Sequence, residues 1–275
     1  MKYTIRQAGS NVNVTPTSPL REFFLLTAGL LGGVIGIYIL LGLAVDLIVP
    51  RISTDLENKM GRLFIRSIEA KDMDSQRKSY IRSLLEDLQE RCAQLPYSIK
   101  VHIRQASTVN AAALPAGHII VYTGLLDKVA SENELAFVLA HEMGHFAHRD
   151  HLRGMGRAFV FITISTLLFG TDSSISKMLA HGLNITEMSF SRKQETRADE
   201  FALETLHCNY GHVAGATDFF EKISKVEDPG KFGHYFASHP ERRKRISHLE
   251  NIIRSREFKL GRRDPLPKTW RQLKD

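Results

Sequence analysis

Hydrophobic and polar positions divide the chain into an apolar N-terminal stretch and a longer mixed region. Residues 23–45 contain no charged side chain. As a helix they would reach about 34 Å, enough for a hydrocarbon core of roughly 30 Å. We therefore expect a transmembrane anchor at 23–45, after an N-terminal tail of residues 1–22. A cleaved signal peptide is the alternative, since Gly42 and Ala44 would suit cleavage, but the stretch is longer than a usual signal core.

A second apolar run extends from Ala158 to Gly170, between Arg157 and Asp172. It has too few residues to cross a bilayer unaided. We interpret it as a buried core helix or an interfacial segment, so the chain is expected to cross the membrane once.

The region from 52 to 255 alternates between helical and extended patterns and is expected to form one domain. Apolar residues recur with helical spacing before Pro96, namely Ile81, Leu84, Leu85 and Leu88. The alternation over residues 98–104 predicts a strand with one buried face, and further strand signal covers 110–113 and 118–122. Pro115 and Gly117 interrupt this signal, which indicates an edge or irregular strand.

The next predicted helix begins at a capping box. Ser131 and Glu134 have the S-x-x-E spacing that satisfies backbone N–H groups at a helix start. Leu135, Val138 and Leu139 then supply an apolar face. This helix carries the residues most suggestive of chemistry.

Composition narrows the class of protein. With 43% hydrophobic and 24% charged residues the chain is globular, and its net charge of +7 comes from an excess of Lys and Arg after residue 240. We expect residues 256–275 to form a basic tail. It lacks interleaved aromatic residues and any nucleic-acid module, so no nucleic-acid partner is expected, and lipid headgroups or solvent are the favoured surroundings.

The chain has two cysteines, Cys92 and Cys208. They are too few and too far apart in sequence to predict a disulfide scaffold or a thiolate zinc site. They also give little indication of the redox compartment.

The predicted helix after Ser131 contains the motif His141-Glu142-Met143-Gly144-His145. Histidines four residues apart project from one face of a helix, so both imidazoles can bind one zinc ion. Glu142 lies beside them, where its carboxylate can accept a proton from water activated by the metal. The motif predicts a zinc hydrolase with Glu142 as general base.

A catalytic zinc site needs a third protein ligand and an open position. Glu195 and Asp199 lie four apart on a segment with a helical apolar face, so one carboxylate can bind zinc while the other orients a ligating histidine. His151 is the second candidate ligand. It stands where a longer zinc motif has its third histidine, but His148 occupies the glycine position of that motif.

Four segments in order resemble the membrane-associated zinc metallopeptidase family that includes CAAX prenyl proteases, the heat-shock protease HtpX and the mitochondrial protease Oma. These segments are residues 110–126, the motif at 141–145, residues 191–199, and Ser238-His239-Pro240 with Arg245. The prenyl proteases and HtpX of this family have several membrane-spanning helices, whereas this chain has one convincing membrane-spanning segment. That difference favours quality control or processing over prenyl-protein cleavage.

The resemblance implies a mainly α, α+β gluzincin fold with a small sheet. It implies that Glu195 is the third zinc ligand beside His141 and His145, with Asp199 next to it. It also implies endopeptidase activity, with His239 and Arg245 near the reacting atoms. We expect one Zn²⁺ per chain.

The expected activity is hydrolysis of unfolded or membrane-associated proteins, with His239 or Arg245 stabilising the oxyanion. An extended substrate could add as a strand at Asn110, Ala111, Ala112 and Ala113. The alternative is a membrane-tethered chaperone or adaptor that binds client proteins with little proteolysis.

Charges around the predicted anchor indicate its orientation. Lys2, Arg6 and Arg21 precede it, and Arg51 and Lys59 follow it. This slight bias places the N-terminus in the cytoplasm. We expect the catalytic part on the extracytoplasmic side of a bacterial inner membrane.

The expected anchor also contains two G-x-x-x-G pairs. They are Gly29 with Gly33, and Gly32 with Gly36. Small residues at this spacing let helices approach closely in a bilayer, so a homo-oligomer is a possible assembly.

Overall fold

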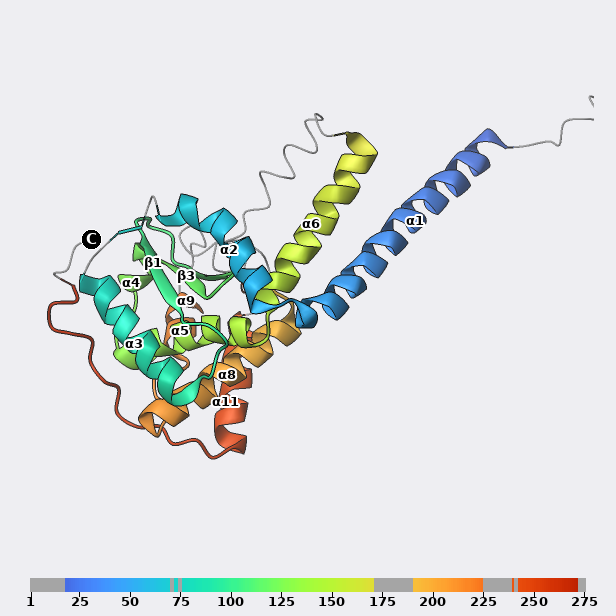
Figure 1. Ribbon diagram of the computed structural model, residues 1–275. Coiled ribbons are helices and arrows are strands. Elements are labelled where there is room, and N and C mark those ends of the chain that lie inside the picture. The colour runs from blue at the N-terminus through green and yellow to red at the C-terminus, as the bar shows by residue number, and fades with distance from the viewer. Residues whose placement is uncertain are drawn as a thin grey trace, which may run out of the picture.

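The computed structural model describes residues 18–69, 72–73, 76–170, 190–224, 239 and 242–271 (Figure 1). The elements are α1 (Pro19–Ile48), η1 (Val49–Arg51), α2 (Thr54–Glu69), α3 (Gln76–Cys92), β1 (Lys100–Arg104), β2 (Ala111–Leu114), β3 (His118–Tyr122), α4 (Thr123–Leu126), α5 (Glu132–Ala147), α6 (Asp150–Phe169), α8 (Arg192–Tyr210), α9 (Asp218–Ser224) and α11 (Arg242–Ser255). Helices surround one small sheet. The predicted mainly α, α+β fold is confirmed.

The sheet has the order β1-β3-β2, so β2 forms an edge. β3 pairs in parallel with β1 and antiparallel with β2. The turn between β2 and β3 uses Ala116 and Gly117, both with positive φ. A Cβ on Gly117 would lie 2.7 Å from the Ser98 carbonyl oxygen, so the turn requires glycine there. The strands expected around 98–104, 110–113 and 118–122 are present.

Helix α5 runs through the core between β2 and α8. Phe137, Leu139 and Phe146 on α5 are fully buried. Each such side chain contributes about 1.5–3 kcal/mol by leaving water. Gly144 permits the close approach of α5 to α8, because a Cβ there would lie 2.9 Å from the Cα of Ala198. Packing of α5 against α8 thus fixes the relative position of the two helices that carry the predicted zinc ligands.

The starts of α5 and α8 differ in their caps. Ser131 Oγ accepts a hydrogen bond from the Glu134 N–H at 3.2 Å, as predicted. The Glu134 carboxylate accepts instead from the Ala130 N–H and from Lys222. The predicted capping box of α5 is therefore only half formed, because a buried carboxylate gains more from a cation. A complete box is formed at α8 by Ser191 and Gln194.

Cys92 and Cys208 form a disulfide bond, which corrects the expectation drawn from their separation of 116 residues. The fold brings the ends of α3 and α8 together, and the two Cα atoms lie 5.8 Å apart. Sequence separation does not limit such a bond; only the folded geometry does.

Residues 256–271 lie against the domain (Figure 1). Trp270 is 3% exposed, and its indole N–H donates to the Leu126 carbonyl. The Glu132 N–H donates to the Asp264 carbonyl at the start of α5. The packed domain therefore continues beyond residue 255, where the sequence suggested a basic tail, because an aromatic anchor holds this segment.

Helices α1 and α6 project from the same side of the domain (Figure 1). No residue of α1 is buried. The interpretation of residues 158–170 as a buried core helix is wrong, because they belong to the 20-residue helix α6, whose large apolar side chains are mostly exposed. The alternative of an interfacial segment stays open at this point.

Candidate metal centre

The structure brings four possible ligands to one point. His141 and His145 lie one turn apart on α5, and Glu195 lies on the first turn of α8. With His239, they offer ligand atoms that all lie within 4.8 Å of one another, and all four side chains are buried. Two imidazoles and a glutamate match the donor set of known catalytic zinc sites. The predicted ligands therefore meet, and His239 joins them.

Asp199 and Arg245 lie behind His141. Asp199 Oδ1 is 2.9 Å from His141 Nδ1, which leaves Nε2 directed toward the other ligands. Arg245 donates to both oxygens of Asp199, at 2.6 and 2.9 Å. Its Nη1 lies 2.6 Å from Glu195 Oε2. The guanidinium thus holds both carboxylates of α8 in place.

The second histidine has a partner that sequence reasoning missed. Asp150 Oδ2 lies 3.3 Å from His145 Nδ1, and both side chains are fully buried. Gln194 and Arg197 of α8 donate to the other oxygen of Asp150 at 3.0 and 3.1 Å. An aspartate five residues after His145 could have suggested a partner for that histidine. The direction of its side chain, however, depends on the turn between α5 and α6.

Arg149 makes that turn, in the left-handed conformation with φ of 56°. Its guanidinium donates to the carbonyls of Val49 and Ile52, at the end of the N-terminal helix. The glycine absent at position 148 is therefore not needed here, since the next residue turns the chain.

The alternative ligand His151 is directed elsewhere. Its Nε2 lies 2.9 Å from Glu57 Oε1 on α2, and its Nδ1 faces the His145 carbonyl. His148 bonds the Gly144 carbonyl at the end of α5. Neither lies in the four-residue cluster.

Glu142 is fully buried beside the cluster. Neither carboxylate oxygen has a hydrogen-bond partner among the described residues, and His239 Nε2 is 3.6 Å from Oε1. Burial raises the pKa of Glu142, while the imidazoles of His239 and His145 oppose the rise. A buried carboxylate that is approached only by imidazoles and one backbone N–H is costly unless its cavity also holds a donor or a cation. The residues thus fit a metal ion with water.

Charges around the cluster favour anionic carboxylates. Burial alone would raise the pKa of Glu195, but His239 and Arg245 hold it well below its usual range. Burial lowers the pKa of His141 to about 3, and Arg245 adds to this effect. A neutral imidazole and an ionised carboxylate are the protonation states that bind metal. Burial favours the neutral form of His145 too, but Asp150 and Glu195 raise its pKa to about 9, so metal would displace a proton from this histidine.

The edge strand β2 lies next to the catalytic helix. Ala111, Ala112 and Ala113 are buried and pair with Val121 to Ile119 of β3 on one side only. The backbone N–H of Ala113 faces the Glu142 carboxylate. The Asn110 side chain accepts from the Ala111 N–H. The proposed strand-addition edge therefore passes directly beside the proposed base.

Phe190 covers the cluster from the start of α8. Its ring stacks on His145 with centroids 3.8 Å apart, and it also contacts His239. An aromatic ring on this side restricts how the imidazole of His145 can turn.

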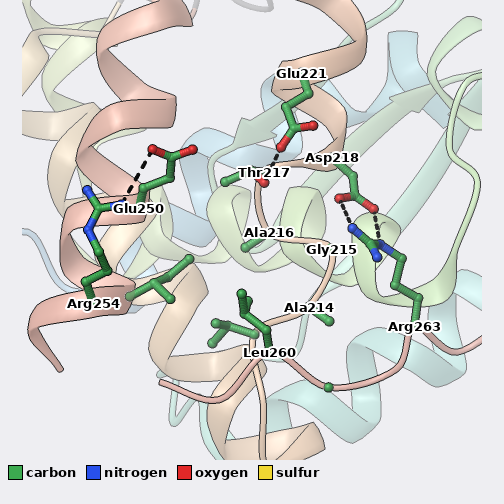
Figure 2. A pocket seen from close by; sticks show the side chains of 13 residues that line it. Ala214, Gly215, Ala216, Thr217, Asp218, Glu221, Glu250, Arg254, Leu260 and Arg263 are labelled. Atoms are coloured by element: carbon green, nitrogen blue, oxygen red, sulfur yellow. Dashed lines mark hydrogen bonds and ion pairs between the residues drawn. The ribbon is translucent and has the colours of Figure 1, made fainter. Parts of the chain in front are cut away.

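Among the described residues, one cavity borders this centre and another lies apart from it. One of about 370 Å³ reaches Glu195 and Asp199 from the side of Arg192 and Lys244. The other, of about 430 Å³, contains none of the cluster residues, and its charged groups pair with one another, as Arg263 does with Asp218 (Figure 2).

Comparison with known proteins agrees with this geometry. The chain is 32% identical over 161 residues to the metalloprotease LoiP of Escherichia coli, covering 57% of this chain and 62% of LoiP. It is 30% identical over 165 residues to the metalloprotease YcaL of the same organism, covering 58% and 63%. It is 33% identical over 163 residues to the mitochondrial metalloendopeptidase OMA1 of Arabidopsis thaliana, covering 56% and 33%.

The aligned region spans less than two thirds of each of these relatives. The sequence profile of peptidase family M48 matches residues 75–253, which include every member of the cluster. The chain therefore belongs to peptidase family M48.

Proposed function

We propose that the protein is a zinc-dependent endopeptidase anchored in a membrane, with one zinc ion per chain. The observation that carries the proposal is the convergence of His141, His145 and Glu195 around the buried carboxylate of Glu142, which makes no side-chain hydrogen bond among the described residues. A structural zinc site needs no base, so a glutamate beside the ligands that no described side chain hydrogen-bonds favours catalysis. The names of the M48 relatives support the same activity.

His141, His145 and Glu195 would hold the metal. Zinc would supply Lewis acidity toward the scissile carbonyl and toward water. Glu142 accepts a proton from the attacking water and delivers it to the leaving amine, and its raised pKa suits both steps. Asp199 and Asp150 hold the two histidines in position.

His239 is the better of the two proposed oxyanion donors. Its Nε2 lies 3.6 Å from Glu142 Oε1, on the side where substrate would meet the base. The Arg245 guanidinium instead faces Asp199 and Glu195. We assign Arg245 to positioning of the carboxylates.

Protein substrates would bind by adding a strand at Asn110 to Ala113. Backbone hydrogen bonds recognise an extended chain with little dependence on its sequence. This mode suits unfolded or damaged proteins, and hence quality control or processing at the membrane.

Two independent features support one side of the membrane for the catalytic domain. The charges that flank α1 favour a cytoplasmic N-terminus. The disulfide between Cys92 and Cys208 is partly exposed, and such bonds persist in oxidising compartments. We place the catalytic domain on the extracytoplasmic side of a bacterial inner membrane, with α1 as its transmembrane crossing.

Digestion of unfolded casein by the full-length protein in detergent tests the activity. We expect cleavage that a chelator abolishes and added zinc restores. Glu142→Gln should keep the metal and lose hydrolysis, because an amide cannot accept the proton. Normal digestion by Glu142→Gln would contradict the assignment of the base, and digestion unaffected by metal removal would contradict the metallopeptidase.

Orientation is tested on a C-terminally tagged chain in spheroplasts. External protease should remove the tag, and thiol labelling after denaturation should find Cys92 and Cys208 oxidised. A protected tag would refute the extracytoplasmic placement.

A further inference from the structure

Helix α6 presents apolar side chains that the domain leaves uncovered. Leu167 is 81% exposed and Phe159 is 71% exposed, and Leu168 and Phe169 are also exposed. From residue 158 to 169 the helix has no charged residue. Exposed apolar side chains in this density mark a surface that contacts another apolar phase.

Helix α6 packs on α1 at the base of both helices. A Cβ on Gly156 would lie 2.6 Å from Val45, so the glycine allows the backbones to approach closely. One to two turns further from the domain, the rings of Tyr38 and Phe161 meet edge to face at 6.3 Å. The pairing of 45 with 156 and of 38 with 161 shows that the two helices run antiparallel here.

On both helices the charged residues give way to apolar residues at the same distance from the domain. Asp46 is the first charged residue after the apolar part of α1, and Arg157 is the last charged residue before the apolar part of α6. They form an ion pair at 2.9 Å, and about 40% of each side chain is exposed. Arg153, one turn nearer the domain, approaches Asp46 at 3.6 Å. A shared level of charge is what a common headgroup region would impose.

We propose that α6 is embedded in the same bilayer as α1, so that its residues 158–169 lie in hydrocarbon. This goes beyond the single anchor of the proposed function. Twelve residues of helix reach about 18 Å, past the middle of a hydrocarbon core of roughly 30 Å. Phe190, the next described residue after Gly170, lies beside His145, on the side from which α6 enters.

This arrangement fixes the metal centre near the membrane. Helix α6 begins three residues after α5 ends, and its first residue, Asp150, contacts the proposed ligand His145. The metal centre therefore lies about two turns of α6 from the headgroup level that Arg157 marks. Substrate segments that emerge from the bilayer are the ones closest to it.

Site-directed spin labelling of the full-length protein in phosphatidylethanolamine and phosphatidylglycerol vesicles tests the proposal. Single cysteines replace Phe159, Leu167, Leu31 on α1, and Leu260 on the domain. All four side chains are mostly exposed, so the substitutions remove little packing. The native cysteines are bonded to each other and remain unlabelled. Collision rates are compared for oxygen, which partitions into lipid, and for a water-soluble nickel chelate.

We expect the ratio of oxygen to nickel collisions at Leu167 and Leu31 to exceed that at Leu260 several-fold, with Phe159 between them because it lies near the boundary. If the ratio at Leu167 equalled that at Leu260 while the ratio at Leu31 was several-fold higher, the proposal for α6 would be overturned and α1 would still be supported as the membrane anchor. A ratio at Leu31 as low as that at Leu260 would overturn both the embedding of α6 and the assignment of α1 as the anchor. Dipolar broadening at Leu167 together with a ratio as low as that at Leu260 would show a second copy in place of lipid over α6, and would also overturn the proposal.

Discussion

The carboxylate of Asp150 lies 3.3 Å from Nδ1 of His145, five residues further along the chain and across the turn between α5 and α6. It mirrors Asp199, which lies 2.9 Å from Nδ1 of His141. Each proposed zinc histidine thus has its own buried carboxylate, one from α6 and one from α8. Such partners fix the orientation of an imidazole and increase its basicity.

Asp150→Asn should weaken zinc binding about 10 to 100-fold, the usual cost of losing a carboxylate that orients a ligating histidine. Competition with a chromogenic chelator measures the zinc affinity directly, without reference to activity. Asp55→Asn is the matched control, because Asp55 is exposed and pairs only with Lys59 among the described contacts. Equal zinc affinity in Asp150→Asn and in the unmodified protein would refute a positioning role.

Glu195→Ala should be more severe than Asp199→Ala. The first removes a proposed ligand, so metal content and peptidase activity should both collapse. The second removes the partner of His141, so some zinc should remain when metal is in excess. Metal content by atomic spectroscopy at several zinc concentrations separates the two. If Glu195→Ala kept full zinc content, the third ligand would have to be His239 or a residue outside the cluster.

Replacing Cys92 and Cys208 by serine should lower stability. The bond closes a loop across 116 residues of sequence, and loss of a native disulfide costs about 2 to 5 kcal/mol. Denaturant midpoints of the detergent-solubilised protein measure the effect. The serine variant should match the reduced unmodified protein and should not respond to reductant itself. Identical midpoints for oxidised and reduced protein would contradict a stabilising role.

Acid should destabilise the fold through His118. Burial lowers the pKa of His118 to about 4, and the neighbouring His102 and Lys100 on β1 add to the effect. His118 Nδ1 lies 2.8 Å from His102 Nε2, and His102 Nδ1 bonds Asp72. The unfolded chain takes up this proton near pH 6.5, before the folded one, so stability falls as the pH drops from about 6.5 toward 4.

The His118→Asn variant tests this pH dependence, because asparagine can still reach His102 but does not titrate. Its melting temperature should fall less than that of the unmodified protein between pH 7.5 and 5. Chelator-treated samples exclude the loss of metal as a cause, and the exposed His207, changed to Asn, is the control. A drop equal to that of the unmodified protein would assign the acid sensitivity to other groups.

The sequence by itself determined the local features of this protein. The uncharged residues 23–45, the helical spacing around Leu84 and the H-E-x-x-H motif depend on periodicity within one segment, and periodicity directly reflects which face of an element is buried. The location of Glu195 and Asp199 on one face of a helix was predictable for the same reason. The roles of all these residues at the metal remain proposals.

Only the tertiary structure decided which distant segments meet. The disulfide between Cys92 and Cys208, the contact of Asp150 with His145 and the burial of Trp270 each depend on packing between elements, which no local pattern encodes. The same holds for α6, whose length and composition alone do not distinguish a membrane helix from a buried core helix. Its exposure beside α1, with Arg157 paired to Asp46, is a property of the fold.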